Sequence, residues 1–324
     1  MPRELWFTAP RRVELREATR GELSSGQLRL RALASGVSQG TELLLYRGEG
    51  PTPFDPSLDA PATPTFPRRY GYAWVGEVTE ARAPGVALGA RFFALLPHGD
   101  EHCVPASTAR ALPAGVPAER AVLAANLETA LNVVWDAGIT LGDHVLVLGG
   151  GVVGILVGHL AKRAGARQVS LSEPSALRRG AALALGFDAA YAPEALPADC
   201  VDVVVEASGD PACLDVAIAH ARDEGAIAVA SFYGMRAASL ALGSDFHRRR
   251  LTLRSSQVSR ISPGRSARWS LDRRFEEVGQ LLKNVALDAL IEEPLAFSEA
   301  TQLYARLARA PGESLQSVFH YRVL

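Results

Sequence analysis

The sequence predicts an α/β protein in which a parallel sheet, covered by helices on both faces, accompanies a β-rich region. From residue 118 to 254, apolar runs of strand length alternate with helical segments, starting with the buried-strand candidate 144–148. Residues 1–117 instead hold strand candidates such as 27–33 and 91–96, separated by proline and glycine. Alternation of strands and helices is typical of a parallel sheet. Six strand candidates suit a doubly wound Rossmann domain.

The expected strands of the parallel sheet are six short apolar runs, 144–148, 168–172, 189–191, 202–206, 226–232 and 251–254. Helical segments are expected at 118–137, 155–161, 175–185, 211–222 and 273–282. Residues 51–67 contain six prolines and no clear period, so a loop is expected there.

The turn after strand 144–148 carries a glycine signature. Gly149, Gly151 and Gly154 fit G-x-G-x-x-G and lead into a helix that begins near Val152-Val153. In a dinucleotide-binding unit the first glycine forms the tight turn and the second lets the pyrophosphate approach the backbone. The third lets helix and strand pack closely, and the helix N-terminus faces the phosphate charge. Because glycine-rich turns are common, the residues that follow decide how specific this signal is.

Glu173 stands 19 residues after Gly154, at the end of the expected strand 168–172. A carboxylate there can accept both ribose hydroxyls of NAD and would repel the 2′-phosphate of NADP. Arg178 and Arg179 favour the opposite preference mildly, because arginine pairs well with phosphate. We therefore predict NAD(H) in preference to NADP(H), bound through Gly149, Gly151, Val152, Val153, Gly154 and Glu173.

Length and composition describe an ordinary globular protein with a hydrophobic core. The chain has 324 residues, enough for about two domains, with 48% hydrophobic and 21% charged residues. A net charge of −1 gives no support to binding of nucleic acid or of a membrane surface. The N-terminus lacks the apolar core of a signal peptide, and three scattered cysteines form no disulfide framework. We expect a cytoplasmic protein that acts on a small-molecule substrate.

The order of these pieces resembles the medium-chain dehydrogenase/reductase superfamily over essentially the whole chain. The resemblance is carried by residues 36–43, 71–78, 149–154 and 206–209, which read GVSQGTEL, GYAWVGEV, GGGVVG and EASG. It implies an NAD(P)-dependent oxidoreductase. Similarity to a small subgroup around bacteriochlorophyllide dehydrogenase is carried by residues 97–105, 245–247 and 254–258.

The resemblance also implies a domain organisation. A GroES-like catalytic domain is expected from residues 1–117 and 255–324, and a Rossmann dinucleotide-binding domain from residues 118–254. Members of the superfamily commonly form homodimers, and the resemblance implies the same oligomeric state here.

Zinc alcohol dehydrogenases of the superfamily hold their catalytic metal with three residues, none of which is kept here. Ser38 or Gln39 replaces a cysteine, Tyr72 replaces a histidine, and Ala125 replaces a cysteine or carboxylate. These side chains lack the usual ligand chemistry for zinc. No cysteine-rich lobe for a structural zinc follows residues 91–96. The resemblance therefore implies a protein without zinc.

Without a metal, hydride transfer requires another group to handle the charge on the substrate oxygen. Thr41 matches the hydroxyl residue that relays a proton in zinc alcohol dehydrogenases; the alternative is a turn threonine bonding its own backbone. Tyr72 is expected to point into the active-site cleft as a neutral donor, or else to fill the vacated zinc site. His98, on a loop expected to border the substrate, is either a general acid or a structural histidine. Glu42 matches a position at which members of the superfamily usually have a structural residue, so no catalytic role is expected for it.

Further cofactor contacts follow from the resemblance. Arg178 matches a position where NAD-linked relatives place a basic residue near the ribose, and Thr129 matches one beside the nicotinamide. Strand ends on the cofactor side of the sheet carry Ala207, Ser208, Ser231 and Phe232.

Three functions fit this sequence. The first is a zinc-independent oxidoreductase acting on a carbonyl/alcohol pair with NAD(H). The second is an NAD(P)H-dependent reductase of an activated C=C bond in an enone, quinone or enoyl thioester. The third is a non-catalytic dinucleotide-binding protein.

Overall fold

The computed structural model describes residues 1–51, 54 and 65–321. Most of the expected proline-rich loop at 51–67 therefore lies outside the described residues. The chain divides into two compact units, one formed by Met1–Ala125 with Glu277–Leu324 and the other by Asn126–Glu276. The expected domain limits were 117/118 and 254/255.

Residues 255–276 belong to the second unit because side chains tie them to its first helix. Ser256 Oγ–H donates to Asp136 at 2.7 Å, and Arg274 forms an ion pair with Glu128 at 3.1 Å. The assignment of these residues to a catalytic domain stays a prediction.

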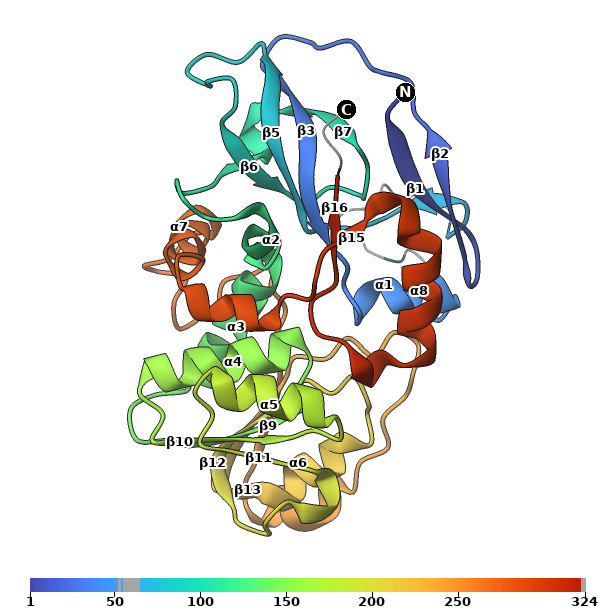
Figure 1. The fold of residues 1–324 in the computed structure, drawn as a ribbon. Coiled ribbons are helices and arrows are strands. Elements are labelled where there is room, and N and C mark those ends of the chain that lie inside the picture. The colour runs from blue at the N-terminus through green and yellow to red at the C-terminus, as the bar shows by residue number, and fades with distance from the viewer. Residues whose placement is uncertain (52–53, 55–64, 322–324) are drawn as a thin grey trace. The chain divides into compact units, whose positions relative to one another are not determined.

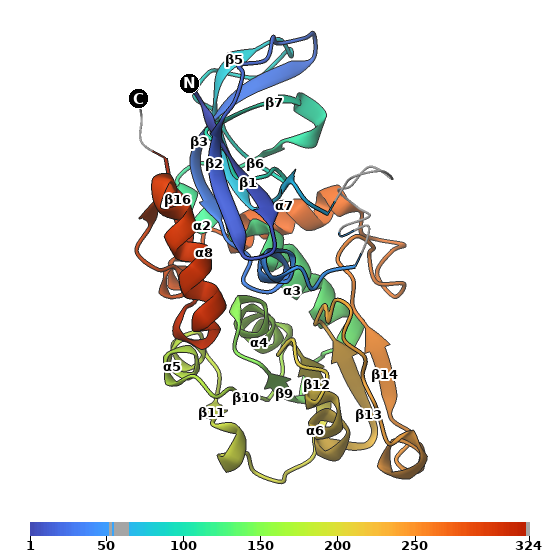
Figure 2. The ribbon, with the colours of Figure 1, turned by 90° about the vertical axis from the view of Figure 1, so that its right-hand side faces the viewer.

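The second unit contains a six-stranded sheet in which every neighbouring pair is parallel. The strands, in spatial order, are β11 (Ala189–Tyr191), β10 (Gln168–Ser172), β9 (His144–Leu148), β12 (Val201–Glu206), β13 (Ala221–Val229) and β14 (Thr252–Ser255). Figure 2 shows them in this order. The order is that of a doubly wound sheet, and it confirms the predicted fold class.

Helices cover both faces of this sheet. The chain passes from β9 to β10 through α4 (Val152–Ala164) and from β12 to β13 through α6 (Cys213–His220). These crossovers run in opposite directions along the sheet, so right-handed connections place α4 and α6 on opposite faces. Figure 1 shows α4 together with α5 (Ala176–Ala184) on one side of the sheet. The central strands β9 and β12 are correspondingly buried, with Val147 and Val205 both at 0% exposure.

The first unit contains two sheets. The larger holds β3 (Gln27–Gly36), β5 (Trp74–Ala81), β6 (Arg91–Ala94), β7 (Glu101–Pro105), β8 (Arg110–Ala111), β15 (Leu295–Ala296) and β16 (Val318–His320). Its order is β15-β16-β3-β5-β6-β8, and β7 also pairs with β3. The smaller holds β1 (Arg3–Ala9), β2 (Arg12–Glu17) and β4 (Arg68–Arg69), in the order β2-β1-β4.

The C-terminal part of the chain completes this unit. β16 pairs antiparallel with β3, so residues near 319 lie beside residues near 35. In Figure 1, α8 (Ala300–Arg309) lies beside α1 (Thr41–Arg47). Aromatic rings join the two helices, since the Tyr46 and Tyr304 centroids are 5.6 Å apart. The tail therefore supplies both a strand and a helix to the first unit.

The remaining helices are short or contain one of the two sequence positions at which the chain passes from one unit to the other. They are α2 (Ala118–Ala121), α3 (Ala124–Ala137), α7 (Leu271–Leu281), the 3₁₀ turns η1 (Ala106–Thr108), η2 (Pro193–Ala195), η4 (Val285–Leu290), η5 (Phe297–Glu299) and η6 (Pro311–Glu313), and the π-helical turn η3 (Leu242–Phe246). The single helix expected at 118–137 is thus two helices, because Leu123 N–H bonds back three residues to Arg120 and tightens the turn. Along the described part of the chain, no helix combines the length and apolarity needed to cross a membrane.

His102 makes the stability of the first unit sensitive to acid. Its ring packs edge-on against Trp74, with centroids 5.0 Å apart, and its Nε2–H donates to the Pro97 carbonyl at 2.9 Å. Burial lowers the pKa of His102 from 6.5 to about 4. Between these two pH values the unfolded chain binds more protons at this residue than the folded chain. The free energy of unfolding therefore falls as the pH is lowered from 6.5 to 4.

His102→Gln keeps an N–H donor for Pro97 and removes the titration. We expect the variant to lose less stability than the wild type across this window, by on the order of 2 kcal/mol. Urea unfolding at a series of pH values measures the difference. Equal pH slopes for the two proteins would show that His102 is not held neutral by the fold.

Candidate active site

The three glycines of the turn after β9 have three different environments. Gly149 has a φ of +97°, and a side chain there would place its Cβ 2.4 Å from Ser208 Cα. A Cβ at Gly154 would lie 2.0 Å from the Gly149 carbonyl oxygen, so α4 packs directly on the turn. A Cβ at Gly151 would meet no described atom within 4 Å. The space beside Gly151 is open to a ligand, as the second glycine of a dinucleotide turn requires.

Gly151 is also the N-cap of α4, a helix of 13 residues that has no side-chain cap. The N–H groups of Val152 and Val153 have no acceptor among the described residues. Such unpaired N–H groups and the helix dipole attract an anion. Val152 and Val153 are partly exposed. This end of α4 therefore fits the pyrophosphate of a dinucleotide.

Glu173, at the end of β10, is tied to the glycine turn. Its Oε2 accepts the Gly150 N–H at 2.7 Å, and its Oε1 accepts the Ser175 N–H at 2.9 Å. A Cβ at Gly150 would lie 2.9 Å from Glu173 Cγ, so this position also needs glycine although the motif does not specify it. Each carboxylate oxygen keeps a second lone pair. Glu173 can therefore still accept a ribose hydroxyl.

A second buried carboxylate, Glu206, orders the loop after β12. It accepts the Ser208 N–H at 2.7 Å and the Ser208 Oγ–H at 2.5 Å, and the Tyr233 hydroxyl donates to it at 2.5 Å. Burial, reinforced by Glu206, raises the pKa of Tyr233, so the phenol stays a donor. The next strand end is joined to the same loop, because Ser231 Oγ accepts the Gly209 N–H at 2.9 Å. Sequence reasoning missed Tyr233, which carries no local motif.

The other expected cofactor residues lie in the second unit as well. Thr129 is a partly exposed residue of α3, and Ala207 follows β12 directly. Arg178 is 14% exposed and its Nη1 lies 4.0 Å from the Glu173 carboxylate. Phe232 is 47% exposed. These positions stay predictions as ligand contacts.

In the first unit, hydroxyl groups meet at the N-terminus of α1. The Tyr72 hydroxyl donates to Ser38 Oγ at 2.5 Å, and the Thr41 N–H donates to the same oxygen at 3.3 Å. All three residues are partly exposed. The Thr41 hydroxyl makes no hydrogen bond with the described residues. The structure thus brings Thr41 and Tyr72 together through Ser38.

Beneath this pair lies the buried carboxylate of Glu42, with 0% exposure. Its Oε1 accepts the Ser38 N–H at 2.9 Å. Its Oε2 lies 3.0 Å from His98 Nε2 and accepts the Tyr304 hydroxyl. Burial and the neighbouring carboxylate raise the pKa of Tyr304 well above its usual value, so this phenol also stays a donor.

The position of His98 favours the structural histidine over the general acid, the two roles expected from the sequence. The residue is 1% exposed, and both ring nitrogens are engaged, Nε2 with Glu42 and Nδ1 with Ser35 Oγ at 2.7 Å. A histidine held in this way cannot reach a substrate without breaking a buried hydrogen bond. Sequence reasoning did not pair His98 with Glu42, because no local pattern connects residues 56 positions apart.

The positions that match zinc ligands do not fit a zinc ion. Ser38 and Tyr72 are already joined by a hydrogen bond, the Gln39 amide donates to the Leu315 carbonyl, and Ala125 offers only a methyl group. A hydroxyl or amide, a phenol and a methyl group are not the thiolate, imidazole or carboxylate ligands that zinc takes in proteins. Across residues 1–51, 54 and 65–321, no group of three or more His, Cys, Asp or Glu side chains could hold a metal ion.

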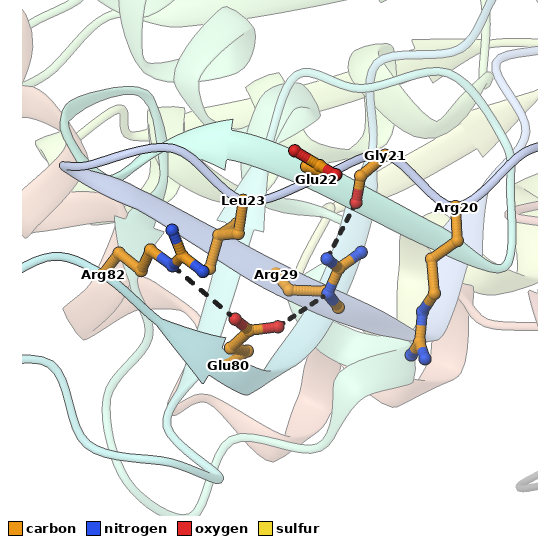
Figure 3. Close-up of a pocket in the computed structure, with 7 residues that line it drawn as sticks. All are labelled: Arg20, Gly21, Glu22, Leu23, Arg29, Glu80 and Arg82. Carbon is orange, nitrogen blue, oxygen red and sulfur yellow. Dashed lines mark hydrogen bonds and ion pairs between the residues drawn. The ribbon is translucent and has the colours of Figure 1, made fainter.

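A hollow of about 400 Å³ in the first unit is lined by none of the groups described above. Its lining residues are Arg20, Gly21, Glu22, Leu23, Arg29, Glu80 and Arg82 (Figure 3). Three of its charged side chains, Arg29, Glu80 and Arg82, are already paired. Arg29 donates to Glu80 at 3.2 Å and to the Gly21 carbonyl at 2.8 Å, and Arg82 lies 3.8 Å from Glu80. This pairing leaves little net charge to attract a ligand.

Residues 152–282 match the family model described as zinc-binding dehydrogenase. This segment is a zinc-binding dehydrogenase-type domain. Scyllo-inosose 3-dehydrogenase of Thermotoga maritima is 42% identical over 76 residues, covering 22% of this chain and 19% of the relative. A 2-dehydro-3-deoxy-L-galactonate 5-dehydrogenase of Pseudoalteromonas atlantica is 36% identical over 115 residues, 33% of each chain. The matches thus span only a fifth to a third of these relatives.

Solved structures match over almost the whole length. A Sinorhizobium meliloti protein described as a zinc-binding dehydrogenase, bound to NADP, has a TM-score of 0.80 at 22% identity, with 99% of both chains covered. 2R,3R-butanediol dehydrogenase of Bacillus subtilis has a TM-score of 0.80 at 17% identity, again with 99% of both chains covered. The fold is that of medium-chain dehydrogenase/reductase structures, with GroES-like and Rossmann domains, as predicted.

The environments of the glycines predict losses of stability of different size for two alanine substitutions. Gly154→Ala must displace the Gly149 carbonyl, so we expect it to lower the free energy of unfolding by about 2 kcal/mol. Gly151→Ala enters open space, and we expect a loss below about 1 kcal/mol, the cost of alanine at an N-cap. Urea unfolding followed by circular dichroism compares them. Equal losses would contradict the close packing of α4 on the turn.

Proposed function

We propose that this protein is a zinc-independent, NAD(H)-dependent oxidoreductase that transfers a hydride between nicotinamide and a carbonyl or alcohol substrate. The observation that carries the proposal is the Tyr72–Ser38 hydrogen bond of 2.5 Å. Tyr72 matches a position where zinc-dependent members of the superfamily have a metal-binding histidine, and Ser38 or Gln39 matches one where they have a metal-binding cysteine. The names of the curated relatives support the reaction class, since those aligned are dehydrogenases.

The second unit would hold the cofactor. Gly151 and the N-terminus of α4 suit its pyrophosphate, and Glu173 suits the ribose hydroxyls. When bound, the nicotinamide supplies or accepts the hydride. Two solved neighbours, at 22% and 18% identity, are bound to NADP and NADH respectively. The preference for NAD(H) is proposed from the Glu173 carboxylate, which would repel a 2′-phosphate.

The first unit would supply the proton. Ser38 Oγ accepts hydrogen bonds from the Tyr72 hydroxyl and the Thr41 N–H, so its own hydrogen can be donated to a substrate oxygen. As hydride reaches the carbonyl carbon, the Ser38 proton passes to the oxygen and the Tyr72 proton passes to Ser38. Solvent then restores the Tyr72 proton. A phenol with a pKa near 10 is neutral at pH 7 and suits this role.

Tyr72→Phe removes the phenol and keeps the ring. We expect kcat to fall about 10²-fold or more with a carbonyl substrate, because a general acid contributes about 10²–10⁴-fold. The dissociation constant for NADH should not change. Steady-state kinetics over a panel of ketones, aldehydes, enones and quinones, with NADH titrated by fluorescence, measures both quantities.

Tyr46→Phe is the matched control, since Tyr46 is a buried phenol of α1 that makes no hydrogen bond with the described residues. If the protein turns over only enones or quinones, the reaction is reduction of a C=C bond and not of a carbonyl. NADH binding without turnover of any compound would favour a non-catalytic protein. One equivalent of zinc in active protein, lost together with activity on chelation, would overturn zinc independence.

Glu173→Gln tests the cofactor preference. The amide keeps nearly the same shape, removes the negative charge, and gives up one of the two backbone N–H bonds that Glu173 accepts. We expect the wild type to bind NADH more tightly than NADPH, and the variant to improve NADPH binding about tenfold relative to NADH, which corresponds to about 1.4 kcal/mol. Glu194→Gln, at an exposed position of the same unit, is the control. A wild-type preference for NADPH would reverse the assignment.

A further inference from the structure

We propose that Glu42 and His98 form a positioning pair that fixes the Ser38–Tyr72 hydroxyl pair, with Glu42 holding Ser38 and His98 holding Tyr72. This inference rests on the proposed function and adds two residues to it. Glu42 is 0% exposed and His98 is 1% exposed. Neither can touch a substrate, so both act through the residues that they hold.

Glu42 holds Ser38 through reciprocal hydrogen bonds. The Ser38 N–H donates to Glu42 Oε1 at 2.9 Å, and the Glu42 N–H donates to the Ser38 carbonyl at 3.0 Å. The Thr41 N–H completes the set by donating to Ser38 Oγ at 3.3 Å. This arrangement resembles a capping box, in which a serine and a glutamate at a helix start satisfy each other's backbone. It fixes where Ser38 Oγ stands.

His98 holds Tyr72 through the glycine before it. A Cβ at Gly71 would lie 2.9 Å from His98 Cδ2 and 3.0 Å from Nε2, so the Gly71 backbone rests directly against the imidazole ring. Gly71 has a φ of +133°, a conformation that side-chain-bearing residues rarely adopt. The His98 N–H also donates to the Tyr70 carbonyl at 3.3 Å. A shift of the ring would move the backbone that carries Tyr72.

The ring itself is held from both sides. Nε2 lies 3.0 Å from Glu42, and Nδ1 lies 2.7 Å from Ser35 Oγ, which is 2.6 Å from the Tyr321 hydroxyl. One arrangement of hydrogens satisfies the whole chain: Tyr321 donates to Ser35, Ser35 to Nδ1, and Nε2–H to Glu42. Burial raises the pKa of Tyr321, which keeps this phenol protonated. The ring cannot turn without breaking two buried hydrogen bonds.

The test compares His98→Leu, which removes both ring nitrogens, with His98→Gln, which keeps an N–H donor for Glu42. We expect His98→Leu to lower kcat about 100-fold with an unchanged KM for NADH, the size of effect caused by a displaced catalytic group. His98→Gln should recover most of that loss. His102→Gln, a partly buried histidine of β7, is the matched control.

Gly71→Ala tests the contact between the ring and the Tyr72 backbone. The added Cβ would collide with His98, so we expect a loss of kcat similar to that of His98→Leu. Gly85→Ala is its control, because Gly85 also has a positive φ of +76° and a Cβ there would meet no described atom within 4 Å. A φ of +133° is costlier for alanine than one of +76°, so the Tyr72 signal and kcat of folded protein, and not the loss of stability, decide between the two variants.

A readout without turnover separates this inference from the proposed function. Tyrosine labelled with ¹³C at Cζ reports each phenol by NMR, and Tyr72→Phe identifies the Tyr72 signal. We expect this signal to shift in His98→Leu and Gly71→Ala and to stay unchanged in both controls. If the wild type turns over no carbonyl or enone, the proposed function fails and the Tyr72 signal still decides the positioning role.

The inference is overturned if folded His98→Leu and Gly71→Ala proteins keep both the Tyr72 signal and kcat. It is also overturned if His98→Gln behaves as badly as His98→Leu while its circular dichroism spectrum is native, since the N–H donor to Glu42 would then be irrelevant. Should His98→Leu not fold, the comparison of Gly71→Ala with Gly85→Ala decides.

Discussion

The first unit depends on the buried carboxylate of Glu42. A charge removed from water is costly unless hydrogen bonds replace its hydration. Here the replacements come from separate parts of the chain: the Ser38 N–H beside α1, the imidazole of His98 and the phenol of Tyr304 on α8. The C-terminal tail therefore supplies a hydrogen-bond donor to this carboxylate, in addition to the pairing of β16 with β3. Tyr304 must reach α1, or the carboxylate loses a donor.

In the second unit, too, buried carboxylates hold the loops of the candidate site. Glu173 and Glu206 are 4% and 0% exposed, and each accepts backbone N–H groups of the loop that it organises. A buried carboxylate has four lone-pair sites, so it can hold a loop and still accept a ligand. Loops without regular structure need such anchors, since their backbone groups have no ladder or helix partners. In both units the candidate site is made of loops held by carboxylates.

Short-range sequence patterns predicted the sheet and the first turn of the second unit. Few such patterns mark the contacts of the first unit, so many of those contacts were not predicted. Strand periodicity, the glycine turn and the position of Glu173 all lie within short windows, so the sheet and its first turn followed from them. The pairing of Glu42 with His98 spans 56 residues and that with Tyr304 spans 262. No spacing rule connects such residues, and the sequence consequently left the role of His98 open between a general acid and a structural histidine. The break between α2 and α3 also escaped prediction, because neither glycine nor proline marks it.

The charge beneath the hydroxyl pair bears on how a substrate could react there. A divalent metal would stabilise a developing alkoxide by direct attraction. Ser38 or Gln39, together with Tyr72 and Ala125, offers no set of zinc ligands. Ser38 instead lies against the carboxylate of Glu42, whose Oε1 accepts the Ser38 N–H. That charge would disfavour an alkoxide formed before proton transfer. The proposed reaction therefore favours transfer of the proton together with the hydride, because no full negative charge then develops on the oxygen. A hydroxyl pair fixed in place before substrate binds meets this requirement, because a coupled transfer tolerates little displacement of the donor.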